Sequence, residues 1–337
     1  MLNFDKEKYL QVTGGAVNLR GRIEAVIDEV SDKGYENVFL IGIGGTIAAM
    51  YPFEYMLKSN STIPVYAEIA AEFSVMGHKH FSENSLVILY SLSGTTPETV
   101  AAAEYCKEKG ATTIGLVGEL GTPLADAVDY PIANYAENDF GGDSSAIQLY
   151  LLIFRLMYKR DSFPHYEKFA DELVTIPDQL ISVKEQGEAQ AEAFAEKYKD
   201  EKYHIFTGAG NLWGKTYSYA MCVLEEMQWI RTKSIHAAEF FHGTLEIVDE
   251  ETSIVVVKGE DETRPLLERV ENFGETYTNK LTIFDTADFE LSGISQEFRK
   301  YLSPLIMNTF LQRVSVHLED KRGHSLEKRR YYRKVEY

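Results

Sequence analysis

The chain has 337 residues, 45% of them hydrophobic, and a formal net charge of -18 at pH 7. This length is typical of two domains rather than of one hydrophobic core. The acidic balance excludes sequence-independent binding to nucleic acid, which needs a basic surface, so we expect no nucleic-acid partner.

No segment of the sequence predicts a membrane span, a metal site or a disulfide framework. The longest apolar stretch, 146–158, is interrupted by Gln148 and Arg155, is too short to cross a bilayer and predicts a buried helix. Cys106 and Cys222 lie in apolar or helical sequence without the spacing of metal ligands. Because the N-terminus also lacks a signal-peptide pattern, we expect a cytoplasmic protein without a membrane partner.

The first half of the chain alternates short apolar strands with helical segments. A helix begins within the first twenty residues, and an apolar strand then ends in the glycine turn at 42–46. The next apolar strand, 86–90, runs into a serine-rich turn at 91–96, and a further strand covers 112–117. This alternation predicts a parallel sheet with helices on both faces.

The serine-rich turn predicts a phosphate site. A helix start offers unpaired N–H groups and the positive end of the macrodipole, and Ser91, Ser93 and Thr96 add hydroxyl donors without adding charge. Pro97 suits the first turn of the following helix. Ordinary capping by Ser and Thr is the alternative interpretation of such a turn.

A dinucleotide site is the alternative for the glycine turn. The pattern would be Gly42-x-Gly44-x-x-Ile47, in which isoleucine stands where a third glycine or alanine belongs. The following strand offers only Glu68 as a ribose-binding acid, so the dinucleotide interpretation is the weaker one.

The second half repeats the first in the same order. A glycine turn follows the strand at 204–208, a second Ala-Glu-Phe triplet stands at 238–240, and apolar strands cover 254–257 and 280–284. The predicted fold is therefore α/β, with two tandem doubly wound parallel-sheet domains in three layers, at 1–165 and 166–337. The counterpart of the serine turn, 258–263, is acidic and would repel phosphate, so only the first domain is expected to bind it.

A group of carboxylates and imidazoles in the second half predicts acid–base chemistry. Glu226 lies on a helix after the second glycine turn, and His236, Glu239 and His242 follow within twenty residues. Such groups supply the two proton transfers that sugar isomerisation needs. The alternatives are that the neighbouring Glu225 only faces solvent and that His236 is a core histidine; His242, before a glycine, is expected on an exposed turn.

The duplication, the turn at 91–96 and the placement of Glu226 sixteen residues before His242 together resemble the sugar isomerase (SIS) domain family. Its members include the isomerase part of glucosamine-6-phosphate synthase and the fructosamine-6-phosphate deglycases. The segments 224–245 and 329–337 are most similar to the deglycases, including those that act on fructoselysine 6-phosphate.

The resemblance implies roles for particular residues. Ser91, Ser93 and Thr96 correspond to phosphate ligands, and Thr46, after Gly45 of the first glycine turn, is a further one. Glu226 corresponds to the acid–base carboxylate beside C1 and C2 of the sugar. His242 corresponds to the imidazole that assists ring opening from the partner subunit, which implies a homodimer or a higher oligomer with shared sites. Possible sugar contacts are Ser144, Ser145 and Lys328.

The resemblance also implies the reaction. The lysine that the synthase places three positions before its helix glutamate is Val223 here, and the glutamine-hydrolysing domain of the synthase is missing. We therefore expect hydrolysis of a fructosamine 6-phosphate to glucose 6-phosphate and a free amino acid, without metal or organic cofactor. The alternatives are an aldose–ketose phosphate isomerase, an aminotransferase-like isomerase and a non-catalytic sugar-phosphate sensor. The acidic turn at Glu260–Glu262 would favour a cationic amino acid such as lysine.

Overall fold

The computed structural model describes residues 1–136 and 140–336. The chain divides into two compact units, residues 5–178 and residues 1–4 with 179–337. The division falls after Asp178, whereas we expected the domains to divide after residue 165. Each unit is described by itself.

The unit at 5–178 contains a five-stranded sheet in the order β2-β1-β3-β4-β5, with every neighbouring pair parallel. Its strands are β1 (Asn37–Gly42), β2 (Val65–Ile69), β3 (Ser85–Tyr90), β4 (Thr112–Val117) and β5 (Tyr130–Ala133). Its helices are α1 (Lys6–Asn18), α2 (Arg20–Lys33), α3 (Gly45–Asn60), α4 (Ala70–Met76), α5 (Pro97–Glu108), α6 (Pro123–Ala127), α7 (Gly141–Lys159) and α8 (Tyr166–Glu172). The expected strands and the buried helix over 146–158, now part of α7, are confirmed.

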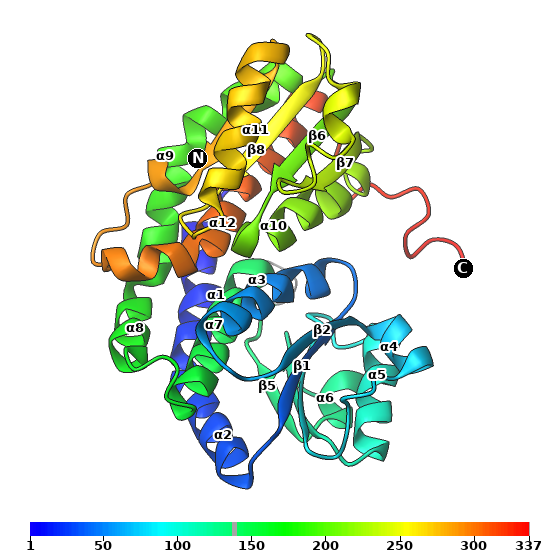
Figure 1. Ribbon diagram of the computed structural model, residues 1–337, viewed down its shortest axis with the longest axis vertical. Helices are drawn as coiled ribbons and strands as arrows, with labels where there is room; N and C mark the ends of the chain where they lie inside the picture. The colour runs from blue at the N-terminus through cyan, green and yellow to red at the C-terminus, as the bar shows by residue number, and fades with distance from the viewer. Residues whose placement is uncertain (137–139, 337) are drawn as a thin grey trace. The chain divides into compact units, whose positions relative to one another are not determined.

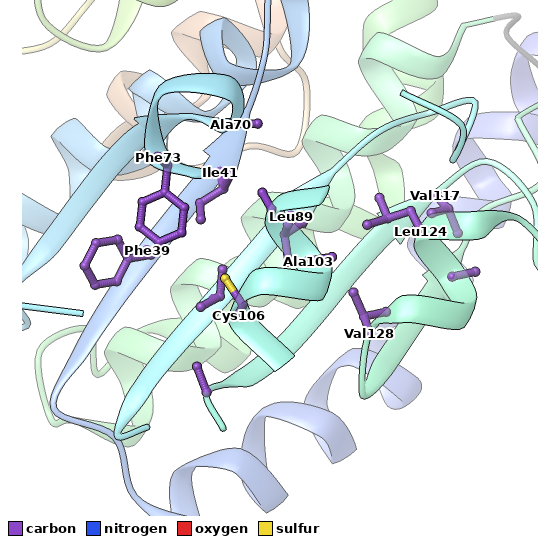
Figure 2. Packing of buried hydrophobic residues seen from close by; sticks show 14 of the residues in the cluster. Phe39, Ile41, Ala70, Phe73, Leu89, Ala103, Cys106, Val117, Leu124 and Val128 are labelled. Carbon is purple, nitrogen blue, oxygen red and sulfur yellow. The ribbon is translucent and has the colours of Figure 1, made fainter. Parts of the chain in front are cut away.

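Helices cover both faces of this sheet, as the sequence predicts. On one face, Phe39 of β1 and Leu89 of β3 pack with Phe73 of α4 and Cys106 of α5, all at most 1% exposed (Figure 2). Each fully buried large apolar side chain contributes about 1.5–3 kcal/mol to folding. On the other face lies α7 (Figure 1), whose side chains are apolar almost all round and mostly buried.

The second unit repeats this arrangement with four parallel strands in the order β7-β6-β8-β9. Its strands are β6 (Tyr203–Gly208), β7 (Arg231–His236), β8 (Ser253–Lys258) and β9 (Leu281–Asp285). Its helices are α9 (Ile176–Tyr198), which begins before the division, α10 (Trp213–Ser218), α11 (Arg264–Tyr277) and α12 (Gln296–Arg322). The order matches β2-β1-β3-β4 strand for strand, which confirms the internal duplication; β5 has no counterpart in the described residues of the second sheet.

Aromatic packing joins the second sheet to two long helices. Phe284 of β9 lies between Phe194 of α9 and Phe310 of α12, with ring centroids 5.2 and 4.9 Å away. On the opposite face, Val256 of β8 packs with Leu267 of α11 in a separate buried cluster. The second unit is therefore also a layer of strands between layers of helices.

An ion pair between a buried arginine and a partly exposed glutamate ties the first residues of the chain to this unit. Arg313 of α12 is 2% exposed and donates to both carboxylate oxygens of Glu188 on α9, at 2.6 and 2.9 Å. The backbone N–H of Leu2 donates to the same carboxylate at 3.0 Å, and its carbonyl accepts from Arg313 at 2.6 Å. Glu188 thus links two helices and the N-terminal segment.

No helix among residues 1–136 and 140–336 has both the length and the apolar character needed to cross a membrane. In the same part of the chain, no group of three or more His, Cys, Asp and Glu side chains is placed to hold a metal ion.

Candidate active site

The serine-rich turn follows β3 and leads directly into α5. Ser91 is 1% exposed, and its hydroxyl lies 2.9 Å from Oγ1 of Thr96 and 3.5 Å from Oγ of Ser93. Thr96 stands at the N-cap position of α5, but its side chain does not cap the helix. The three hydroxyl groups therefore gather at the first turn of the helix, where the amide dipoles favour an anion.

Glycine is required at the tip of this turn. Gly94 has a φ of +63°, and a Cβ there would approach Thr122 Oγ1 to 2.1 Å. Backbone bonds from Gly118 N to the Leu92 carbonyl and from Leu124 N to the Gly94 carbonyl hold the turn against its neighbours. The hydroxyl groups are therefore carried on a fixed backbone rather than on a loose loop.

The first glycine turn follows the adjacent strand β1 at the same edge of the sheet, because β1 and β3 pair in parallel. Gly44 has a φ of +58° and precedes α3. The hydroxyl of Thr46 accepts from the N–H of Ile43 and donates to its carbonyl, each at 3.0 Å. In this conformation Thr46 stabilises its own turn, and Gly45 is exposed beside it.

At the second glycine turn, which corresponds to the first, the carboxylate of Asp261 is bound to backbone N–H groups. Asp261 accepts from the backbone N–H of Asn211 at 2.8 Å and from the N–H of Thr263 at 2.8 Å. It is 7% exposed, and a Cβ on Gly210 would lie 2.4 Å from its Oδ2. A carboxylate thus stands at the glycine turn where the first unit is open.

The other charges of the acidic turn are also paired, which weakens the reason for expecting this turn to select a cationic amino acid. Glu260 accepts from Arg299 through both oxygens, at 2.9 and 2.8 Å. Glu262 pairs with Lys300 at 2.6 Å. Since both partners lie on α12, far along the chain, the sequence of the turn alone overstates its free negative charge.

Glu226 stands where a π-helical stretch, Tyr219–Glu225, ends after α10. Such wide helical turns are frequent at functional sites. The Glu226 side chain is 28% exposed and accepts from Nε of Arg329 at 2.7 Å. The preceding Glu225 instead accepts from the Thr232 hydroxyl at 2.5 Å. Of the two adjacent carboxylates, one is bound to β7 and the other faces the C-terminal segment.

The C-terminal segment is tied to the residues beside Glu226. Gln228 is fully buried and donates to the His324 carbonyl at 2.7 Å, while its side-chain oxygen accepts from Arg322 at 3.1 Å. Arg329 donates to the Leu326 carbonyl at 2.6 Å as well as to Glu226. These hydrogen bonds explain why the C-terminal segment, which has no regular secondary structure, lies beside the Glu226 carboxylate.

Glu226 borders a cavity of 810 Å³ within the second unit. Trp229 and Ile230 form part of its wall, together with the tail residues Arg329 and Arg330. Lys328 is exposed, and its Nζ lies 5.1 Å from the centre of the Trp229 ring. The cavity is therefore large enough for a small organic molecule and combines aromatic, anionic and cationic groups.

The two histidines lie in different surroundings. Burial lowers the pKa of His236, an effect that Glu239 opposes, and its Nδ1 accepts from Ala238 N at 3.2 Å. His242 is exposed, before Gly243 with its φ of +135°. His242 is not among the described residues that border the Glu226 cavity.

Ser144 and Ser145 are buried at the start of α7. The Ser144 hydroxyl donates to the Gly141 carbonyl at 3.1 Å and accepts from Asn134 at 2.7 Å. Burial raises the pKa of Tyr90, an effect that its hydrogen bond with Ser145 opposes. Both serines therefore serve interior hydrogen bonds in this conformation.

Sequence reasoning missed that Arg329, Arg330 and Trp229 border the Glu226 cavity. The ending at 329–337 resembles that of the deglycases, but the resemblance implies no role for these residues. The only local signal is a cluster of basic and aromatic residues near the chain end, and nothing in that cluster indicates contact with Glu226, about a hundred positions earlier.

Comparisons relate this chain to known proteins. The SIS domain family matches residues 33–160. The chain is 36% identical to the fructosamine deglycase FrlB of Bacillus subtilis (strain 168), over 94% of this chain and 97% of that protein. It is 23% identical to the fructoselysine 6-phosphate deglycase of Escherichia coli (strain K12), over 92% and 89%. A solved structure from Bacillus subtilis, assigned as a phosphosugar isomerase, superposes with a TM-score of 0.89 at 32% identity, over 99% of this chain and 100% of that one.

Proposed function

The chain belongs to the SIS domain family, and we propose on that basis that it hydrolyses fructosamine 6-phosphates to glucose 6-phosphate and a free amino acid. The observation that carries the proposal is the 36% identity to a fructosamine deglycase along almost the full length of both chains. The carboxylate at the Glu226 cavity and the hydroxyl-rich turn at 91–96 are the chemical groups that such a reaction requires.

Binding of the phosphate is assigned to the turn after β3. The hydroxyls of Ser91, Ser93 and Thr96 converge at the first turn of α5. Neutral donors on a helix start bind a dianion without a fixed ion pair. Phosphate binding anchors the sugar, so that the reacting carbons are held in one position.

The reaction moves one proton between adjacent carbons and then adds water. His242 of a second copy of the chain assists ring opening, which gives the C2 ketone. Glu226 removes a proton from C1, the electron pair forms the C1–C2 double bond, and the π bond of the C2 carbonyl breaks as its oxygen takes up a proton, which gives an enaminol. Protonation of C2 and loss of the N–H proton give an aldimine, which water hydrolyses to the aldehyde of glucose 6-phosphate and the free amine. The overall reaction involves no net oxidation or reduction. The hydrogen bond from Arg329 holds the Glu226 carboxylate in place.

A simple aldose–ketose phosphate isomerase is the second candidate. It is favoured by the close superposition on a Bacillus subtilis structure assigned as a phosphosugar isomerase. Such an enzyme needs the same proton transfer between C1 and C2 but no nitrogen on the substrate.

The decisive experiment incubates the protein with fructosamine 6-phosphates of several amino acids and, separately, with fructose 6-phosphate. Glucose 6-phosphate is followed by a coupled dehydrogenase, and the released amine by mass spectrometry. A deglycase forms both products in equal amounts from the adducts. Conversion of fructose 6-phosphate alone assigns the isomerase, and no product from either substrate class refutes both.

Two variants test the assigned carboxylate. Glu226→Gln keeps the shape of the side chain but removes the base, so kcat falls by about a hundredfold or more. Glu275→Gln, an exposed position on α11, is the matched control and keeps the wild-type rate. A Glu226→Gln variant with the control's kcat removes Glu226 from the proposed role.

Mixing inactive variants tests the shared site. If Glu226 and His242 come from different copies, a hybrid of Glu226→Gln and His242→Ala subunits contains one intact site. Mixing the two proteins under subunit exchange then restores about a quarter of the wild-type rate, since half of the dimers are hybrids with half of their sites intact. No recovery, despite hybrids detected by native mass spectrometry, contradicts the shared site.

A further inference from the structure

The position of the substrate's amino acid follows from the position of Glu226 if the proposed function holds. In a fructosamine, C1 carries both the proton that Glu226 removes and the nitrogen of the amino acid. The α-carboxylate carbon is three bonds from C1, which places it within about 4 Å of that carbon. The amino acid therefore lies in the 810 Å³ cavity that Glu226 borders.

Three arginines border this cavity, and their surroundings differ. Arg329 is already bound to Glu226 at 2.7 Å and to the Leu326 carbonyl at 2.6 Å. Arg231 and Arg330 are both exposed, and Arg231 lies at the first position of the edge strand β7. The guanidinium carbon of Arg330 lies 3.9 Å from the centre of the Trp229 ring, and no described carboxylate pairs with it.

The stacking of Arg330 leaves its hydrogen-bonding edge available. A guanidinium on an aromatic face is held through its plane, while its N–H groups point outward in the geometry that a carboxylate accepts. Because the stacking limits its rotamers, less freedom is lost when an anion binds.

The ring below Arg330 is itself held in place. Trp229 has a φ of +57°, and its backbone N–H donates to the Glu225 carbonyl at 3.2 Å. Its indole ring meets the His324 ring edge-on, with the ring centroids 4.5 Å apart. The preceding Gln228 is fully buried with both ends of its amide bonded. Trp229 is therefore a rigid support for the arginine.

We propose that Arg330, stacked on Trp229, binds the α-carboxylate of the substrate's amino acid. The substrate class is then fructosamine 6-phosphates attached through an α-nitrogen. Adducts of amines without a carboxylate lack this interaction. Adducts at the side-chain nitrogen of lysine place the carboxylate carbon seven bonds from C1 instead of three, so we expect them to lack this interaction.

The test compares two substrates that differ only in the carboxylate: the fructosyl 6-phosphate adducts of leucine and of 3-methylbutylamine. For the wild-type protein, kcat/KM is about tenfold to a hundredfold higher for the leucine adduct, the value expected of one charged hydrogen-bonded pair. Arg330→Ala lowers the leucine value to that of the amine adduct and leaves the amine value within about twofold. Activity on the amine adduct thus reports that the variant is folded.

Two further variants complete the design. Arg330→Lys keeps the charge but loses the planar, two-point geometry, so it recovers only part of the preference. Arg333→Ala is the matched control, since its guanidinium lies near the Tyr332 ring and does not border the cavity; it keeps the full preference.

The outcomes separate this assignment from the proposed function. Equal losses on both adducts in Arg330→Ala, or a wild-type protein that does not distinguish them, overturn the role of Arg330 while the deglycase activity stands. A wild-type protein that cleaves neither adduct refutes the deglycase, and the assignment fails with it.

Discussion

Replacing Glu188 with glutamine is expected to destabilise the unit that contains Glu226. Burial would raise the pKa of Glu188, but the hydrogen bonds from Arg313 and from the Leu2 N–H, with the Arg313 charge, lower it to about 2 from the usual 4.5. At about 1.36 kcal/mol per pH unit, this difference corresponds to about 3 kcal/mol. Because the Glu188 side chain is 23% exposed, solvent screening reduces the expected loss to about 2–3 kcal/mol.

The contribution of Glu188 to the free energy of unfolding depends on pH in a predictable direction. A carboxylate whose pKa is lowered by folding stabilises the folded state fully above its unfolded value, near 4.5, and loses this contribution as the pH falls toward 2. The gap between the wild-type protein and Glu188→Gln is therefore full at pH 7 and less than half as large near pH 3.

Urea unfolding followed by tryptophan fluorescence measures this gap. Both tryptophans of the chain, Trp213 and Trp229, lie in the unit that contains Glu188. Glu192→Gln is the matched control, one turn further along α9, where the carboxylate is 54% exposed and pairs with Lys321; its effect is below about 0.5 kcal/mol. The reasoning is refuted if the two variants are equally stable at pH 7, or if the gap is the same at both pH values.

Three further outcomes are expected. Ser93→Ala raises KM for a phosphorylated substrate by about tenfold with little change in kcat, and unchanged steady-state kinetics contradict the phosphate assignment. Arg329→Ala, which frees Glu226, lowers kcat by about tenfold, and Arg329→Lys recovers part of it; a wild-type rate in both shows that the ion pair does not position the carboxylate. Burial lowers the pKa of His204 to about 4 from 6.5, so the free energy of unfolding falls as the pH drops from 6.5 toward 4. In urea titrations His204→Gln has a flatter pH profile over that range, and an identical profile contradicts the burial argument.

The sequence was most informative where the chain determines its own local structure. Strand β3 is a continuous apolar run that ends in hydroxyl residues and a glycine, and this order alone predicts a buried parallel strand and a turn before a helix. The repeat of the pattern in β6 and β8 predicted the second sheet for the same reason.

The parts that could not be predicted depend on contacts between distant positions. Arg329 reaches Glu226 because Gln228 is buried against residues 322–324, and no periodicity in the tail encodes that docking. The acidic turn has three carboxylates in sequence, yet Arg299 and Lys300, about 40 positions later, neutralise two of them. Local charge patterns do not record such partners.

Because Asp261 occupies the glycine turn of the second unit, the two units are expected to differ in how an anionic ligand changes their stability. The carboxylate of Asp261 fills the second glycine turn, whereas a Cβ on Gly44 of the first turn would meet no atom within 4 Å. On our proposal that the neighbouring turn at 91–96 binds phosphate, the free energy of binding inorganic phosphate at that turn adds to the stability of residues 5–178. Since both indole fluorophores lie in the other unit, a ligand screen that follows only intrinsic emission would overlook this stabilisation, while amide hydrogen exchange within α5 would detect it.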